Sequence, residues 1–459
     1  MNAIRYFVLL LVLLSFHLIC NAYSFIVDGL AYDILTSKTV AVAYMEGYID
    51  SQASWSNNNY KGVNEVNIPS TVTYDSQTYK VTSIGKYAFR NCADLVSVTI
   101  PNTVTSIQYQ AFYKSSKLKD ITIPSSVASV GEQAFESTYW LQSQPDGVVY
   151  AGSAAYICKG NITDDKIVLR DGTKSVSPYC FYNRANITEL TMPNTVLYLG
   201  TFAFWGCTGL TSIELPNSIK KLPDNVFQGC SGLVSVTLPS ALTLIGKWAF
   251  DGCSSLTSVT IPNSVTSIGG SAFYGCSELR TLTLPTGITE IQYNTFAGCK
   301  NLLTVTIPNN VITIQSNAFY NSRIETLIIP NSVTKVGSEA FRGCYIKSLT
   351  FPNSITDFGY DAFLATIDII YCNYTTPPTI NYSTFSSNTY ANTILVVPAG
   401  SEQTYRDNPY WGMFVKIQDG LHFNYGDVFG DMNGDGVVDG IDLNIMIQLI
   451  LGNYEPVNK

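Results

Sequence analysis

Hydrophobic and polar residues alternate in short runs that recur along most of the chain. In the segment LTSVTIP the apolar positions are Leu256, Val259 and Ile261, and in the VTSIG that follows they are Val265 and Ile268. Such alternation is typical of strands that bury one face. Proline ends the first run and glycine ends the second, so the pattern predicts two short strands, joined by a turn, in each unit.

The unit repeats every 23 residues, and the last units shorten to 22. After the second run, a segment such as SAFYGC predicts a short helical or 3₁₀ turn whose phenylalanine fills the core. One coil has no core of its own, whereas stacked coils bury a continuous one. The period therefore predicts a β-rich repeat solenoid of about 14 coils that stack as parallel strands. The phenylalanine keeps the period at Phe204, Phe227, Phe250, Phe273 and Phe296.

This unit resembles the BspA-type leucine-rich repeat, which reads I-P-x-x-V-T-x-I-G-x-x-A-F-x-x-C. The resemblance covers about Val81 to Ala365. It implies a leucine-rich-repeat coil stack that is secreted or exposed at the cell surface and serves in adhesion to host or bacterial surfaces. A right-handed stack is expected from the resemblance and from the general preference for right-handed parallel crossovers.

The N-terminal residues 1–22 carry an apolar run and predict a secretory signal peptide that is cleaved after Ala22. The alternative is a lipoprotein signal ending at Cys20, but that signal requires a small residue where Ile19 stands. No other segment has the run of about 18 apolar residues that a membrane span needs. We therefore expect a mature chain without a transmembrane span, either secreted or at the cell surface.

The domain organisation follows from where the repeat holds and where it fails. Strong alternation in residues 23–80 predicts an N-terminal β cap, because an open first coil would expose a sheet edge. The solenoid is placed at residues 81–366, with one irregular coil at 140–166. A C-terminal β cap at 367–423 and a small α calcium-loop module at 424–459 complete the chain.

Composition and charge exclude several function classes. The chain is only 13% charged, has a net charge of −8 and lacks a basic run, so nucleic acid is not an expected partner. Of its two histidines, His17 leaves with the signal peptide and His422 stands alone, which argues against a histidine triad or a histidine-rich metal site. Carboxylates are scattered and no motif nominates a catalytic pair. We therefore expect no enzyme.

A column of cysteines recurs at one position of the coil. Serine, threonine or arginine replaces cysteine in other coils, so the position tolerates the loss of sulfur. This tolerance predicts a stack of small, half-buried, reduced thiols. Disulfide bonds between neighbouring coils are the alternative. The column includes Cys207, Cys230, Cys253, Cys276 and Cys299.

A column of threonines lies between two inward residues of the first strand and predicts a flat, nearly uncharged outer face. Threonine is also a favoured residue on any solvated sheet face, which is the alternative interpretation. A partial aromatic column beside the cysteine turn would suit protein or glycan contacts. The candidate ligand residues are Thr237, Thr260, Thr283 and Thr306, together with Trp205 and Tyr274.

The segment DMNGDGVVDGID near the C-terminus has the spacing of a calcium loop. Oxygen ligands fall at positions 1, 3, 5, 7, 9 and 12, and Gly436 occupies the sixth, where the backbone turns sharply. Carboxylates packed this densely repel one another without a cation, so the motif predicts bound Ca²⁺. The predicted ligands are Asp431, Asn433, Asp435, the carbonyl of Val437, Asp439 and Asp442.

The loop and the apolar helix predicted after it resemble one half of a type I dockerin. The partner-choosing positions of that family are Gly440 and Ile441 here rather than a polar pair, which departs from the usual pattern for cohesin binding. An apolar stripe on the predicted helix must be covered. We therefore expect a cohesin-like partner or self-association through residues 441–451.

Two functions fit these observations. The first is a non-enzymatic surface or secreted protein that binds protein or glycan through its solenoid. The alternative is an accessory or catalytic component of an extracellular polysaccharide-degrading complex, docked through the dockerin-like module. A pair of carboxylates converging in the irregular coil or the C-terminal cap would favour the alternative.

Overall fold

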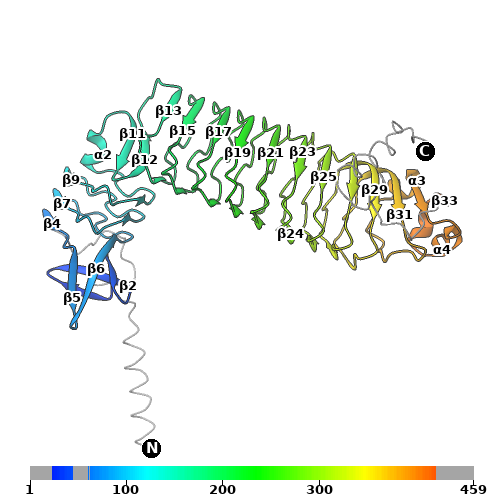
Figure 1. The fold of residues 1–459 in the computed structure, drawn as a ribbon, viewed down its shortest axis with the longest axis horizontal. Helices are drawn as coiled ribbons and strands as arrows, with labels where there is room; N and C mark the ends of the chain where they lie inside the picture. The colour runs from blue at the N-terminus through cyan, green and yellow to red at the C-terminus, as the bar shows by residue number, and fades with distance from the viewer. Residues whose placement is uncertain (1–22, 45–59, 61, 420–459) are drawn as a thin grey trace, which may run out of the picture.

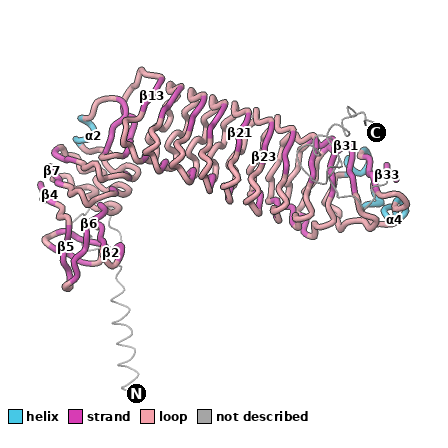
Figure 2. Tube along the Cα trace, in the orientation of Figure 1, coloured by secondary structure: helices cyan, strands magenta, loops and turns pink. Residues whose placement is uncertain are grey.

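The computed structural model describes residues 23–44, 60 and 62–419. They form an elongated rod of stacked coils with a β cap at the N-terminal end and short helices at the other end (Figures 1 and 2). The predicted solenoid is confirmed. No helix among the described residues is long and apolar enough to span a membrane.

The first strands of successive coils form a long parallel sheet along one side of the rod. Most of these strands have three residues, with a buried residue between two exposed ones. Val259 lies beside Leu282, and Leu282 beside Val305, so the buried side chains stack from coil to coil. The 12-stranded sheet contains β13 (Lys166–Val168), β15 (Glu189–Thr191), β17 (Ser212–Glu214), β19 (Ser235–Thr237), β21 (Ser258–Thr260), β23 (Thr281–Thr283), β25 (Thr304–Thr306), β27 (Thr326–Ile328), β29 (Tyr345–Phe351), β31 (Thr366–Cys372), β32 (Ile394–Val397) and β33 (Lys416–Asp419). A separate sheet holds β4 (Glu65–Asn67), β7 (Ser97–Thr99) and β9 (Asp120–Thr122).

The second strands are shorter and form a broken series of smaller sheets. Val265 and Ile268, predicted to point inward, are buried, as are Leu256, Val259 and Ile261. The series contains β8 (Ser106–Ile107), β10 (Ser129–Val130), β14 (Ser175–Val176), β16 (Tyr198–Leu199), β18 (Lys221–Leu222), β20 (Leu244–Ile245), β22 (Ser267–Ile268), β24 (Glu290–Ile291), β26 (Thr313–Ile314), β28 (Lys335–Val336) and β30 (Asp357–Phe358).

The segment that carries the core phenylalanine forms tight turns, so the predicted helical or 3₁₀ turn is wrong. In the coil of Phe273, Ser271 and Gly275 both have left-handed φ angles, of 58° and 69°, which a continuous helix cannot contain. The backbone N–H of Phe273 donates to the carbonyl of Thr295 in the next coil at 2.9 Å. The turn is therefore held by bonds between coils as well as by bonds within it, such as the one from the N–H of Tyr274 to the carbonyl of Ser271 at 3.1 Å.

The phenylalanines form a stacked column inside the rod. The rings of Phe250 and Phe273 are fully buried, with centroids 5.2 Å apart and planes 12° from parallel. The stack runs from Phe89 to Phe135, and resumes at Phe181.

The irregular coil interrupts both the ring stack and the long sheet. It contains α2 (Tyr139–Ser143) and an antiparallel hairpin of β11 (Gly147–Ala151) and β12 (Ala154–Lys159). The ring of Phe135 packs against Trp140 and Tyr156 instead of another phenylalanine. Figure 1 shows the rod bending where β11 and β12 lie.

Both ends of the described rod are closed by additional elements. At the N-terminal end, β3 pairs in parallel with β6 and so covers the edge of the second-strand series. At the C-terminal end, Tyr405, Trp411 and Phe414 are buried under the last strands. The elements are β1 (Phe25–Val27), β2 (Leu30–Thr36), β3 (Thr39–Val42), β5 (Thr71–Tyr74), β6 (Gln77–Ile84), α3 (Ser387–Asn392), α4 (Glu402–Arg406) and the 3₁₀ turn η1 (Trp411–Met413).

Candidate ligand-binding site

The predicted threonine column lies on the outer face of the long sheet. Thr237, Thr260, Thr283 and Thr306 each end a three-residue strand and are exposed. Thr260 pairs with Thr283, and Thr283 with Thr306, so their hydroxyl groups form a row across neighbouring coils.

A second hydroxyl column runs beside the first and was not predicted. Both ends of each three-residue strand face outward, because side chains alternate along a strand. Ser258 pairs with Thr281, and Thr281 with Thr304, so the residues at the first end also form a row. Ser235 continues this column toward the N-terminus. The sequence contains a signal for this second column, because a serine or threonine stands two residues before each threonine of the first column. We call the two columns together the hydroxyl face.

The hydroxyl face becomes acidic toward its N-terminal end. There Glu189 and Glu214 stand at exposed strand ends, beside a hollow of about 370 Å³ that both residues line. Ile328 interrupts the threonine column at the other end. The strands from β19 to β27 contain no charged residue, although the exposed Arg280 directly precedes β23.

The aromatic column lies on the turns that follow the second strands rather than on the hydroxyl face. Tyr274 is 47% exposed, and the rings of Tyr182 and Trp205 stack with centroids 4.5 Å apart. The structure therefore places Trp205 and Tyr274 on a different part of the coil from the candidate threonines.

The cysteine column is fully buried, so the expectation of half-buried thiols is wrong. Each thiol is enclosed by the coil before it and donates to a carbonyl there; Cys253 Sγ lies 3.2 Å from the carbonyl oxygen of Phe227. Ser322 Oγ donates in the same way to Phe296 at 2.7 Å. This shared bond explains why the position accepts other donors. Burial raises the pKa of the Cys207 thiol to about 12, and every cysteine in the described residues is free.

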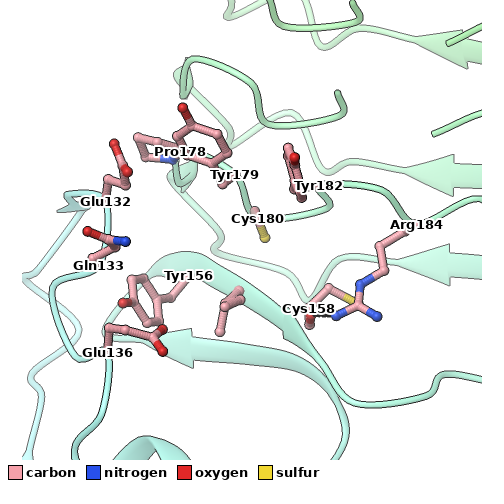
Figure 3. Close-up of a pocket in the computed structure, with 11 residues that line it drawn as sticks. Glu132, Gln133, Glu136, Tyr156, Cys158, Pro178, Tyr179, Cys180, Tyr182 and Arg184 are labelled. Carbon is pink, nitrogen blue, oxygen red and sulfur yellow. Dashed lines mark hydrogen bonds between the residues drawn. The ribbon is translucent and has the colours of Figure 1, made fainter. Parts of the chain in front are cut away.

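A cavity of about 240 Å³ opens at the irregular coil, between the coils of Phe135 and Phe181. Glu132, Gln133 and Glu136 come from the first of these coils, while Tyr179, Tyr182 and Arg184 come from the second (Figure 3). The sequence marked this segment as irregular but nominated none of these residues. The structure thus brings two carboxylates of the preceding regular coil to a cavity beside the irregular coil.

Partial burial raises the pKa of some of the groups that line this cavity. Burial raises the pKa of the Glu132 carboxyl. Burial and then the charge of Glu132 raise the pKa of Tyr179. Arg184 is held by two backbone carbonyls, with Nη1 donating to Gly160 at 2.7 Å and Nη2 to Cys158. Its Nε is buried without a hydrogen-bond partner among the described residues.

Comparison with known protein families decides the identity of the repeat. The family described as the BspA type leucine rich repeat region (6 copies) matches residues 59–164, 150–279, 221–344 and 312–400, which together run from 59 to 400. The chain is a BspA-type leucine-rich repeat protein. A search of curated proteins found no match to it.

Several solved structures are similar to this BspA-type chain. A leucine-rich repeat protein from Bacteroides ovatus is 26% identical, covering 76% of this chain and 94% of its own, with a TM-score of 0.42. A leucine rich cell surface protein from Faecalibacterium prausnitzii is 22% identical over 86% and 98%, with a TM-score of 0.34. The pneumococcal vaccine antigen PcpA is 19% identical over 87% and 99%, with a TM-score of 0.40. These TM-scores are low, so the family assignment rests on the repeat match alone.

Some predicted sites of the BspA-type chain lie outside the described residues. These are the signal peptide at 1–22 and the whole calcium module at 424–459, including all six predicted ligands. Within residues 23–44, 60 and 62–419, no group of three His, Cys, Asp or Glu side chains could hold a metal.

Proposed function

We propose that this BspA-type protein is a non-enzymatic binding protein, secreted or at the cell surface, whose hydroxyl face holds a protein or glycan ligand. The observation that carries the proposal is the pair of hydroxyl columns between β19 and β25, with their threonines and serines in register. Such a face offers donors and acceptors at regular spacing without the desolvation cost of charged groups. Trp205 and Tyr274 would add aromatic contacts on the neighbouring turns.

The calcium module is a separate part of this proposal. Asp431, Asn433, Asp435, the Val437 carbonyl, Asp439 and Asp442 would hold Ca²⁺, since carboxylate and carbonyl oxygens are the donors this ion prefers. The bound loop would order the helix that follows, which would dock on a cohesin-like partner or on a second copy through residues 441–451. This arrangement would leave the solenoid free to bind its ligand.

The test places charge on the hydroxyl face. Replacing Thr237, Thr260 and Thr283 with lysine sets like charges on neighbouring strands, and we expect adhesion of the purified chain to host cells or bacterial surfaces to be lost. The matched control replaces Thr243, Thr266 and Thr289 with lysine, which adds the same charge with the same spacing beside the second strands. Unchanged adhesion by a folded triple variant of the hydroxyl face would refute the proposal.

The second candidate is a component of an extracellular polysaccharide-degrading complex. Glu132 and Glu136 favour it, because they line one cavity beside the irregular coil. Glycoside hydrolysis requires two carboxylates on either side of the bond, one of them with a raised pKa, as burial provides for Glu132. A screen of polysaccharides for released reducing ends tests it. Loss of hydrolysis in Glu132→Gln would support the candidate, and no release from any substrate would reject it.

A further inference from the structure

At the irregular coil, two tyrosine rings have a stacked aromatic neighbour on one side only among the described residues. In the coil of Phe181, Tyr179 stacks on Phe202 at 4.8 Å and Tyr182 stacks on Trp205 at 4.5 Å. Phe202 and Trp205 belong to the next coil and do not line the cavity, whereas both tyrosines do. The opposite faces of the two tyrosine rings therefore bound the cavity.

Polar groups from the preceding coil face these rings. Glu132 and Glu136 supply carboxylate acceptors. Gln133 accepts a hydrogen bond from Gln110 through Oε1, which leaves its amide nitrogen to donate. On the far side, Arg184 also lines the cavity, and its guanidinium donates to the carbonyls of Gly160 and Cys158. The cavity thus combines flat aromatic surface with both donors and acceptors.

We propose that this cavity is a binding site for a neutral saccharide, separate from the hydroxyl face. The apolar face of a pyranose ring would lie on Tyr179 and Tyr182, and its hydroxyl groups would donate to Glu132 and Glu136 and accept from Gln133. The volume of about 240 Å³ is below the roughly 300–1,000 Å³ typical of pockets for drug-sized ligands, so it suits one sugar unit. The rest of an oligosaccharide would extend over the exposed edge of Tyr182.

The charges select against other ligand classes. Glu132 and Glu136 repel an anionic sugar or a phosphate. A basic side chain would be attracted by these acids and by the tyrosine faces, but the Arg184 guanidinium on the opposite wall opposes it. A polyhydroxylated neutral ring uses the donors and the acceptors together, so it fits the whole lining.

A glycan array that carries neutral and sialylated oligosaccharides tests the site with the chain from residue 23 onward. Calorimetry then measures the affinity for the glycan that binds. We expect binding to neutral glycans, and an affinity about tenfold lower for Tyr179→Ala and Tyr182→Ala, which lose a stacking surface. Tyr182→Phe keeps the ring and should retain binding. Tyr198→Ala, which removes a 64% exposed tyrosine outside the cavity, should bind as the unmodified chain does.

The outcomes separate this site from the hydroxyl face. The lysine triple variant at Thr237, Thr260 and Thr283 should keep its affinity for the neutral glycan even where its adhesion is lost. Absence of neutral-glycan binding, or binding that Tyr182→Ala leaves unchanged, would overturn the proposal. A hexalysine peptide that binds in place of glycans and is released by Glu132→Gln would also overturn it, in favour of a site for cations.

Discussion

The thiol of Cys253 donates a hydrogen bond to the carbonyl oxygen of Phe227, 26 residues earlier, at 3.2 Å. The same bond recurs from coil to coil, and Ser115 and Ser322 make it through a hydroxyl group. The position therefore requires a hydrogen-bond donor rather than sulfur. The bond anchors each turn to the coil before it.

The first prediction follows from this bond. Cys253→Ser keeps the donor and should change the free energy of unfolding little. Cys253→Ala removes one of two hydrogen bonds to the Phe227 carbonyl, which still accepts from the backbone N–H of Cys230 at 3.1 Å, so we expect a loss of about 0.5–1.5 kcal/mol. Urea denaturation of the two variants measures the difference. Equal stability of the serine and alanine variants would show that the bond contributes nothing.

The second prediction concerns the left-handed turn. Gly275 has a φ of 69°, and the equivalent Asn183 and Asn321 have φ angles of 55° and 53°. Gly275→Asn should therefore be tolerated, while Gly275→Val should cost at least roughly 1–2 kcal/mol, because a side chain branched at Cβ is strained in this conformation. Thermal denaturation compares the two variants. A valine variant as stable as the asparagine variant would contradict the assigned backbone.

The buried columns could be predicted from the sequence because each repeats with the coil. If Val259 points inward in its coil, the equivalent residue of each neighbouring coil points inward as well. The coils then stack in register as parallel strands. The cysteine environment was misjudged because the atoms that enclose Cys253 belong to the preceding coil, and a pattern read within one coil does not include them.

The cavity could not be predicted for a related reason. The repeat shows only that the pattern fails between Phe135 and Phe181. Whether another ring covers Phe135 depends on how the intervening hairpin folds, and the structure places Tyr156 there at 5.6 Å. The cavity residues Glu132 and Tyr179 are brought together by this replacement, so no spacing in the sequence marks them as a pair.

The third prediction is a loss of stability at alkaline pH. Burial raises the pKa of Cys207, Cys299 and Cys344 from 9.0 to about 12. For an acid whose pKa is raised by folding, the stabilisation is complete below the unfolded value and is lost as the pH rises toward the folded value. The melting temperature should therefore fall as the pH rises from about 9 to 12. The triple serine variant at these positions should lose less than the unmodified chain. An equal loss in both proteins would exclude the thiols as the cause.

The last prediction concerns calcium and the C-terminal segment. Asp431, Asp435, Asp439 and Asp442 lie within one 12-residue motif, and their mutual repulsion would oppose any compact loop unless a divalent cation offset it. Folding of the helix that follows would then depend on the metal, and so would any contact made by its apolar stripe.

Sedimentation of the chain from residue 23 to 459, in calcium and in chelator, measures this coupling. We expect a dimer, or a complex with an added cohesin module, only in calcium. Asp431→Asn combined with Asp435→Asn should abolish the calcium effect, because it removes two anionic ligands. Asp171→Asn, at an exposed solenoid position, is the matched control and should leave the effect intact. A chain that sediments as a monomer in both conditions and binds no cohesin would show that the stripe is not a calcium-dependent docking surface.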